Sequence, residues 1–272
     1  MQVKTIIQSN CYNFAEMETN EYQRYFIHLA YKGTNYHGWQ IQPNAVTIQQ
    51  TLNEALSIIL RKDINLVGAG RTDAGVHASS FYAHFDLNHE QSIDINHLVF
   101  KLNSYLPNDI AIYNVYPVSS NAHARFDATS RTYKYYMFTR KNPFNTDISY
   151  FLFKKVNVEK MNEACSILKY YKDFTSFSKR STETKTNLCD IYRAEWNKKG
   201  YELIFTIEAN RFLRNMVRAI VGTMIEIGEG KLTLEEFTNI IEGQDRTLAR
   251  YSIPADGLFL SDIQYPNSLL NN

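Results

Sequence analysis

Alternating and helically spaced apolar residues predict a chain built from strands and helices in turn. In residues 24–31 every second side chain is apolar, which is typical of a strand with one buried face. After Thr47 apolar residues recur every three to four positions, and Gln50, three residues on, indicates a capping box at a helix start. The remaining elements predicted in this half are strands near 65–67, 81–87 and 110–118, and a helix that Asp94 caps and that ends before Pro107.

The second half repeats this order with different residues. Its predicted elements are a strand at 133–139, a helix from Asn157 to about Tyr170, strands near 193–196 and 202–209, a helix over 210–227 capped by Asn210, a helix from Thr233 to Gly243 and a strand at 257–265. Two such units side by side make one largely antiparallel sheet with helices packed on it, which is the α+β class.

The repeated order also predicts how the chain is divided. We expect an N-terminal lobe over residues 22–120 and a C-terminal lobe over 121–266. A polar extension, residues 1–21, precedes them and a tail, residues 267–272, follows them. The extension has no apolar periodicity, so we expect it to be poorly ordered.

The composition is that of an ordinary globular protein. The chain has 272 residues, of which 44% are hydrophobic and 21% charged. No apolar run reaches about 18 residues, so no transmembrane helix is expected. Cys11, Cys165 and Cys189 are far apart in sequence, so we expect neither a disulfide framework nor a zinc site. No secretory signal is visible, and a reducing cytoplasm is the expected compartment.

The charge distribution is more informative than the net charge of +1. Residues 123–142 contain five basic residues and a single acidic one, Asp127. Tyrosine and phenylalanine residues lie between these cations, from Tyr133 to Phe138. Such a segment is either a solvated basic face or a groove that neutralises phosphates and stacks bases, and the aromatic residues favour the groove.

A glycine-rich loop supplies the first candidate for chemistry. Residues 68–78 read Gly-Ala-Gly-Arg-Thr-Asp-Ala-Gly-Val-His-Ala and lie between two strand-like segments. The carboxylate of Asp73 can serve as a base, a metal ligand or a nucleophile, and a surface ion pair with Arg71 is the plain structural alternative. Metal binding is not expected, because His77, His84 and His123 have no partners at ligand spacing.

Cationic and aromatic candidates lie in the second half. Arg211, Arg214 and Arg218 fall at i, i+3 and i+7 of the helix predicted over 210–227, which puts them on one face. An attacking carboxylate must be ionised, and Arg218 is the candidate cation beside it. In a strand, Arg131 and Tyr133 share a face with Tyr135, so these rings either belong to the core or stack on a ligand.

Several separate segments together carry a resemblance to a known family. The Asp73 loop, residues 130–135, residues 212–218, the turn at 31–43 and residues 254–258 resemble the motifs of the TruA-type tRNA pseudouridine synthases. The resemblance extends from about Tyr22 to about Tyr265. The chain departs from the family pattern at Ser80-Phe81, where a Gly-Gln pair is usual.

The resemblance implies a fold, a reaction and roles for individual residues. It implies the pseudouridine synthase fold, in which two ferredoxin-like lobes form one sheet with a central cleft. The expected reaction is isomerisation of uridines 38, 39 and 40 in the tRNA anticodon stem-loop. Asp73 would be the nucleophile, Tyr133 would stack on the target uracil and Arg218 would pair with Asp73. Arg71, Thr72, Arg131 and Leu258 would contact the substrate.

The resemblance further implies a homodimer that binds tRNA and needs no cofactor or metal, because the isomerisation involves neither redox change nor group transfer. The residues leave open whether Asp73 attacks C6 of the uracil or C1′ of the ribose. Two rival functions remain open from the residues alone. A non-catalytic RNA-binding module would use the same basic and aromatic segments, and a glycoside hydrolase would need a second carboxylate opposite Asp73.

Overall fold

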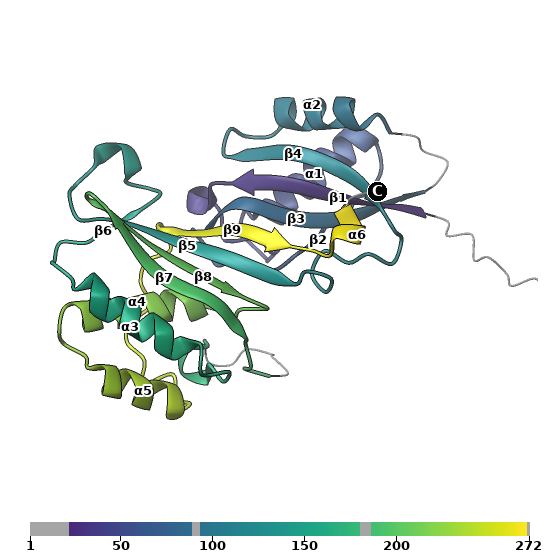
Figure 1. Ribbon diagram of the computed structural model, residues 1–272. Coiled ribbons are helices and arrows are strands. Elements are labelled where there is room, and N and C mark those ends of the chain that lie inside the picture. The colour runs from purple at the N-terminus through teal and green to yellow at the C-terminus, as the bar shows by residue number, and fades with distance from the viewer. Residues whose placement is uncertain (1–21, 89–92, 180–185, 271–272) are drawn as a thin grey trace, which may run out of the picture.

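The computed structural model describes residues 22–88, 93–179 and 186–270, which form a nine-stranded sheet with helices packed on it (Figure 1). The predicted extension, residues 1–21, lies outside the described residues. In chain order the strands and α-helices are β1 (Tyr22–Tyr31), α1 (Ile48–Leu60), β2 (Val67–Gly68), β3 (His77–Asn88), α2 (Ile95–Tyr105), β4 (Ile110–Val118), β5 (Ser130–Phe138), β6 (Tyr150–Phe151), α3 (Val158–Leu168), β7 (Ile191–Lys199), β8 (Glu202–Ala209), α4 (Met216–Gly228), α5 (Leu234–Glu242), β9 (Leu258–Gln264) and α6 (Asn267–Leu270). Short 3₁₀ turns lie at Gly33–Asn35, Pro143–Asn145 and Thr175–Phe177.

The strand order brings the last strand to the centre of the sheet. The order is β4-β1-β3-β9-β5-β8-β7, with β2 beside β3 and β6 beside β5. Strand pairs are antiparallel except β3–β9 and β5–β6. The α+β class with a largely antiparallel sheet is therefore confirmed. Figure 1 shows β9, the yellow strand, between the strands of the first half and those of the second.

Four predicted helix caps are confirmed. The side chains of Thr47, Asp94, Asn157 and Thr233 each accept the amide proton of the residue three positions on. The capping box predicted at Thr47 is wrong in one respect, because the Gln50 side chain donates to Glu54 at 2.9 Å instead of returning to the cap. The helix at Thr233 has the full box, since Glu236 accepts the Thr233 amide proton at 2.8 Å.

Two hydrophobic cores lie on either side of β9. One contains Leu29, Leu52 and Phe81 from the first half, and the other contains Phe205 and Met224 from the second half. Strand β9 contributes to both, Leu258 to the second core and Leu260 and Ile263 to the first. Tyr133 of β5 packs against both cores. The junction between the two halves is therefore built from β5 and β9.

The segment after β4 also packs with the first core, through Ala122, Ala124 and Ala128. The lobe boundary near residue 120 remains a prediction.

Cys165 and Cys189 are buried free thiols, and Cys11 lies outside the described residues. Among residues 22–88, 93–179 and 186–270, no helix is both long and apolar enough to cross a membrane.

Candidate active site

The loop between β2 and β3 carries Asp73 and rests on the turn at residues 33–39. Trp39 donates its amide proton to the Thr72 carbonyl at 3.3 Å, and Gly75 donates to the Tyr36 carbonyl at 3.2 Å. Gly38 has a φ of +86° and leaves no room for a side chain against Thr72. These contacts explain why the two glycine-containing motifs occur together in this sequence.

A buried histidine fixes the end of the loop. Nδ1 of His77 accepts the amide proton of Gly33 at 3.0 Å, so its Nε2 carries the proton and donates to the Asp256 carbonyl at 3.0 Å. The ring also stacks on Phe259 of β9, with 4.5 Å between ring centroids. Burial lowers the pKa of His77, which keeps the imidazole neutral. His77 therefore joins the Asp73 loop to the segment before β9.

Two arginines from the second half meet the carboxylate of Asp73. The Oδ2 atom lies 3.6 Å from Nη1 of Arg218, and Oδ1 lies 3.6 Å from Nε of Arg214. Arg218 is further held by its Nε, which donates to the Ile253 carbonyl at 2.7 Å. The Asp73 side chain keeps 24% of its surface exposed, so a ligand can reach it. The sequence-based pairing of Asp73 with Arg218 is present in the geometry, and Arg214 is an additional cation there.

The helix boundary predicted next to these arginines is wrong. Helix α4 begins at Met216, after Asn215 in the left-handed conformation with a φ of 67°. Asn210 caps no helix, because its side chain bonds the Asp190 amide at 2.9 Å and the Asp190 carboxylate at 3.0 Å. Arg211 and Arg214 therefore precede the helix and do not share its face with Arg218. Arg214 reaches Asp73 from this preceding segment.

Tyr133 lies beside the carboxylate on β5. Its ring packs edge-to-face on Phe212 with 5.1 Å between centroids. Burial raises the pKa of the Tyr133 phenol well above its usual value, and the negative charge of Asp73 raises it further. The phenol therefore stays protonated next to Asp73. An aromatic ring, a carboxylate and two guanidinium groups meet at the junction of the two cores.

The remaining predicted site residues differ in how far they are engaged with the protein. Arg71 is exposed. The Thr72 hydroxyl is buried and shares a hydrogen bond of 2.9 Å with the Tyr31 hydroxyl. Leu258 is 5% exposed, in the second core. Of these side chains, Arg71 has the most freedom to contact a ligand.

The guanidinium of Arg131 is bound to backbone carbonyls of three separate segments. Nη1 donates to Ala128 at 2.9 Å and to Asn210 at 2.8 Å. Nη2 donates to Arg125 at 2.6 Å and to Ala69 at 3.3 Å. Ala69 begins the loop that carries Asp73, so Arg131 fixes this end of the loop as His77 fixes the other.

Sequence reasoning missed three contributors to the site. For Arg214 the sequence leaves open whether it lies on a solvent-exposed basic face or in the site, and it predicts His77 to be an ordinary core or surface histidine. Tyr31 is predicted on one face of a strand and at the start of the motif at 31–43, with no role in the site. Each of these residues acts through a contact with a residue far away in the chain, and the spacing of residues along the sequence does not reveal such contacts. In the described part of the chain no group of three or more His, Cys, Asp or Glu side chains could hold a metal ion.

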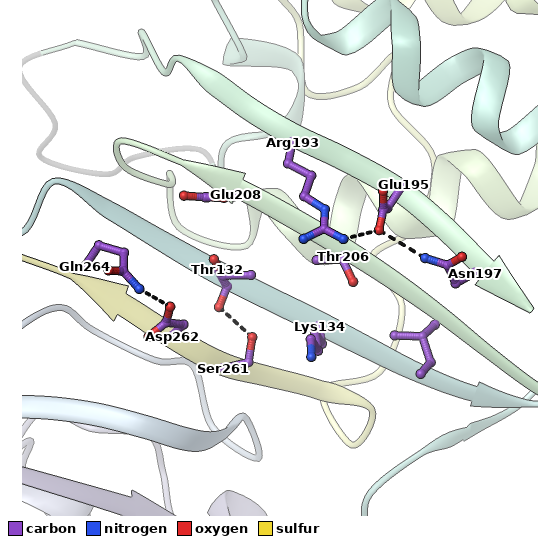
Figure 2. Close-up of a pocket in the computed structure, with 11 residues that line it drawn as sticks. Thr132, Lys134, Arg193, Glu195, Asn197, Thr206, Glu208, Ser261, Asp262 and Gln264 are labelled. Carbon is purple, nitrogen blue, oxygen red and sulfur yellow. Dashed lines mark hydrogen bonds and ion pairs between the residues drawn. The ribbon is translucent and has the colours of Figure 1, made fainter.

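The opposite face of the sheet has a separate hollow of about 490 Å³ (Figure 2). Polar side chains of β5, β7, β8 and β9 line it, among them Lys134, Arg193, Glu208 and Asp262. Lys134 follows Tyr133 in the strand and so points to the other face. The hollow therefore contains none of the predicted site residues.

Comparison with known proteins gives one consistent result. The sequence model of a family described as tRNA pseudouridine synthase matches residues 27–127 and 170–266. The chain is 56% identical over 247 residues to tRNA pseudouridine synthase A of Parabacteroides distasonis, covering 91% of this chain and 98% of the relative. It is 55% identical to the protein of that name from Bacteroides fragilis, with 91% and 98% covered, and 39% identical to that from Thermoanaerobacter sp., with 88% and 98% covered. The chain therefore belongs to the tRNA pseudouridine synthase family, a family of isomerases.

Proposed function

We propose that this enzyme isomerises uridines 38, 39 and 40 of the tRNA anticodon stem-loop, with Asp73 as its nucleophile. The observation that supports this most directly is the meeting of the Asp73 carboxylate with Arg218 and Tyr133 at the junction of the two cores. A partly exposed carboxylate held by two arginines suits attack on a bound nucleoside.

The reaction is an isomerisation, so its atoms balance within the substrate. Asp73 attacks the bound uridine, and the bond between C1′ and N1 breaks. The uracil turns and a bond forms between C1′ and C5. C5 loses a proton and N1 gains one, while the carboxylate is released unchanged. No redox change or transfer to another molecule is required.

The surrounding residues then have distinct tasks. Tyr133 stacks on the target uracil, and its protonated phenol avoids a second negative charge beside Asp73. Arg218 holds the carboxylate with its Nη1 atom, and its own position is fixed by the bond from its Nε to the Ile253 carbonyl. Arg71 reaches into the RNA, because a target base in a stem must leave its stack before it can be attacked. Thr72, Arg131 and Leu258 shape the substrate pocket, since each is engaged with protein groups.

The assembly and location follow from the same proposal. We infer a homodimer that binds one tRNA across both subunits and acts in the cytoplasm, where tRNA is processed. The lobes 22–120 and 121–266 enclose the RNA between them. Size measurement in solution, with and without tRNA, tests the dimer.

The catalytic proposal is tested by incubating an anticodon stem-loop with the protein in EDTA and mapping pseudouridine at each position. We expect conversion at 38, 39 and 40, and tritium release from C5-labelled uridine. The Asp73→Ala variant should bind the RNA and release tritium at least about 1000-fold more slowly, because removing a nucleophile costs at least this much in other enzymes. An unchanged rate in this variant would show that another group attacks, and a requirement for a divalent ion in the chemical step would contradict the mechanism.

A further inference from the structure

The turn at residues 123–127 exposes an aromatic ring although its backbone is tightly held. Phe126 is 73% exposed. Nδ1 of His123 accepts the amide protons of Arg125 at 3.1 Å and Phe126 at 3.4 Å. The Asp127 carboxylate accepts the His123 amide proton at 2.7 Å, and the Asp127 amide donates back to the His123 carbonyl at 3.1 Å. The backbone that carries Phe126 is therefore fixed by a closed network, so little backbone ordering is needed on binding.

The ring has the chemical surroundings of a base-stacking site. It packs against the His123 imidazole with 4.2 Å between centroids, and the Arg125 guanidinium lies 5.7 Å from its centroid. An exposed ring with a cation beside it suits an unpaired base, because the ring stacks on the base while the cation attracts the phosphate.

One side chain ties this turn to the loop that carries Asp73. Nη2 of Arg131 donates both to the Arg125 carbonyl and to the Ala69 carbonyl, so one side-chain nitrogen atom holds the turn and the loop together. The Tyr265 hydroxyl fixes the turn from another side by donating to the Ala124 carbonyl at 2.6 Å. The Phe126 ring is thus held next to Arg125, whose backbone is in contact with the start of the Asp73 loop.

Positive charge gathers at the same place. Burial lowers the pKa of Arg131, and the positive charges of Arg125 and Arg211 lower it further. Arg131 contacts the Asp73 loop through the Ala69 carbonyl, and Arg125 and Arg211 lie near enough to Arg131 for their charges to act on it, which suits the phosphate backbone of the proposed RNA complex. A protein partner with an apolar surface would meet this concentration of arginines unfavourably, whereas RNA supplies the complementary charge.

We propose that Phe126, with Arg125 beside it, is a stacking platform for an unpaired nucleobase of the RNA substrate that is not itself the target uridine. The inference rests on the proposed function, because it adds a binding contact to the same RNA complex. Phe126 does not take part in the chemical step.

The test measures binding of a fluorescent anticodon stem-loop, and KM and kcat for pseudouridine formation, for Phe126→Ala, Phe126→Leu and Phe126→Trp. Removing a stacked ring weakens binding by about 5-fold to 150-fold per base. We expect the alanine and leucine variants to raise Kd and KM within this range with kcat unchanged, and the tryptophan variant to bind as the wild type does. Phe100→Ala is the matched control, because Phe100 is 68% exposed on α2, which packs on the edge strand β4. The control should behave as the wild type.

Abasic substitutions in the stem-loop separate stacking from a general structural effect. At one unpaired position, removal of the base should weaken binding to the wild type. On that abasic RNA the wild type and Phe126→Ala should have the same Kd. An equal Kd for Phe126→Leu and wild type would overturn the proposal, as would a penalty that persists on every abasic RNA. A change of oligomeric state in the Phe126 variants with unchanged RNA affinity would assign the ring to a protein interface instead. If the wild type makes no pseudouridine, the proposed function fails, and the binding data still decide the role of Phe126.

Discussion

Substituting Gly38 by alanine places a methyl group directly against the loop that carries Asp73. Gly38 has a φ of +86°, in the left-handed region that side chains with a Cβ rarely adopt. A Cβ at this position would lie 2.3 Å from the Thr72 carbonyl oxygen and 3.1 Å from the Asp73 carbonyl carbon. The atoms in the way are backbone atoms, so a rotamer change cannot relieve the overlap.

The expected magnitude follows from these distances. Ordinary contact with a Cβ begins at 3.4 Å, so the Thr72 carbonyl must retreat by about 1 Å. A left-handed alanine costs about 1–2 kcal/mol, and the overlap adds about 1–3 kcal/mol to the loss in the free energy of unfolding. A displacement of about 1 Å in a reacting group lowers the rate about 100-fold. We therefore expect Gly38→Ala to lose both stability and kcat.

Comparison with a second glycine separates the cost of left-handed backbone strain from the effect of displacing the Asp73 loop. Gly200, between β7 and β8, has a φ of +60°, but a Cβ there would have no atom within 4 Å. Gly200→Ala should therefore lose only about 1–2 kcal/mol of stability and keep its kcat. Tritium release at saturating RNA measures kcat, and urea denaturation measures stability. The reasoning is refuted if Gly38→Ala, folded at the assay temperature, turns over as fast as Gly200→Ala.

Two further predictions concern buried polar contacts. His84 accepts the Ala124 amide proton at 3.1 Å and burial lowers its pKa to about 4, whereas an unfolded histidine has a pKa of about 6.5. As the pH falls, the unfolded chain therefore protonates this histidine before the folded chain does, and about 2 kcal/mol of the free energy of unfolding is lost between pH 7.5 and pH 5. In urea titrations the free energy of unfolding of His84→Gln should depend less on pH than that of the wild type. An equal pH dependence in the two proteins would contradict a lowered pKa of His84. Thr72→Val leaves the Tyr31 hydroxyl buried without its partner and should cost about 1–3 kcal/mol, while the double variant with Tyr31→Phe should cost less than the sum of the single changes. Additive losses in a thermal or urea double-mutant cycle would show that the two hydroxyls do not cooperate.

The sequence predicted local features well because local chemistry determines them. Thr47, Asp94, Asn157 and Thr233 cap helices through bonds that span three residues, and each cap lies where the polar residue precedes an apolar periodicity. Asn210 has the same local appearance. Its side chain instead pairs with Asp190, twenty positions away in the chain, and a cap rule that considers only neighbouring residues cannot detect such a competitor.

The arginine pair at Asp73 was predicted in part through a geometry that the structure does not have. Arg214 and Arg218 were placed on one face of a helix, but only Arg218 is helical. Both still reach the carboxylate, because the segment before α4 brings Arg214 to the other oxygen. Arg218 is the predicted partner of Asp73 because an attacking carboxylate needs a nearby cation and because residues 212–218 resemble the family motif. Neither reason depends on where the helix begins. Residue spacing alone would have failed here.

The distance between Asp73 and Arg218 is set by one short piece of backbone. His77, four residues after Asp73, donates to the Asp256 carbonyl, and Arg218 donates to the Ile253 carbonyl. Both members of the pair are therefore attached to residues 253–256, although they come from different halves of the chain. This segment leads into β9, which joins both cores. These two bonds hold the carboxylate and the guanidinium together across the junction of the two cores. In the proposed mechanism the segment before β9 therefore fixes the nucleophile and its cation relative to each other, although the two residues are 145 positions apart in the chain.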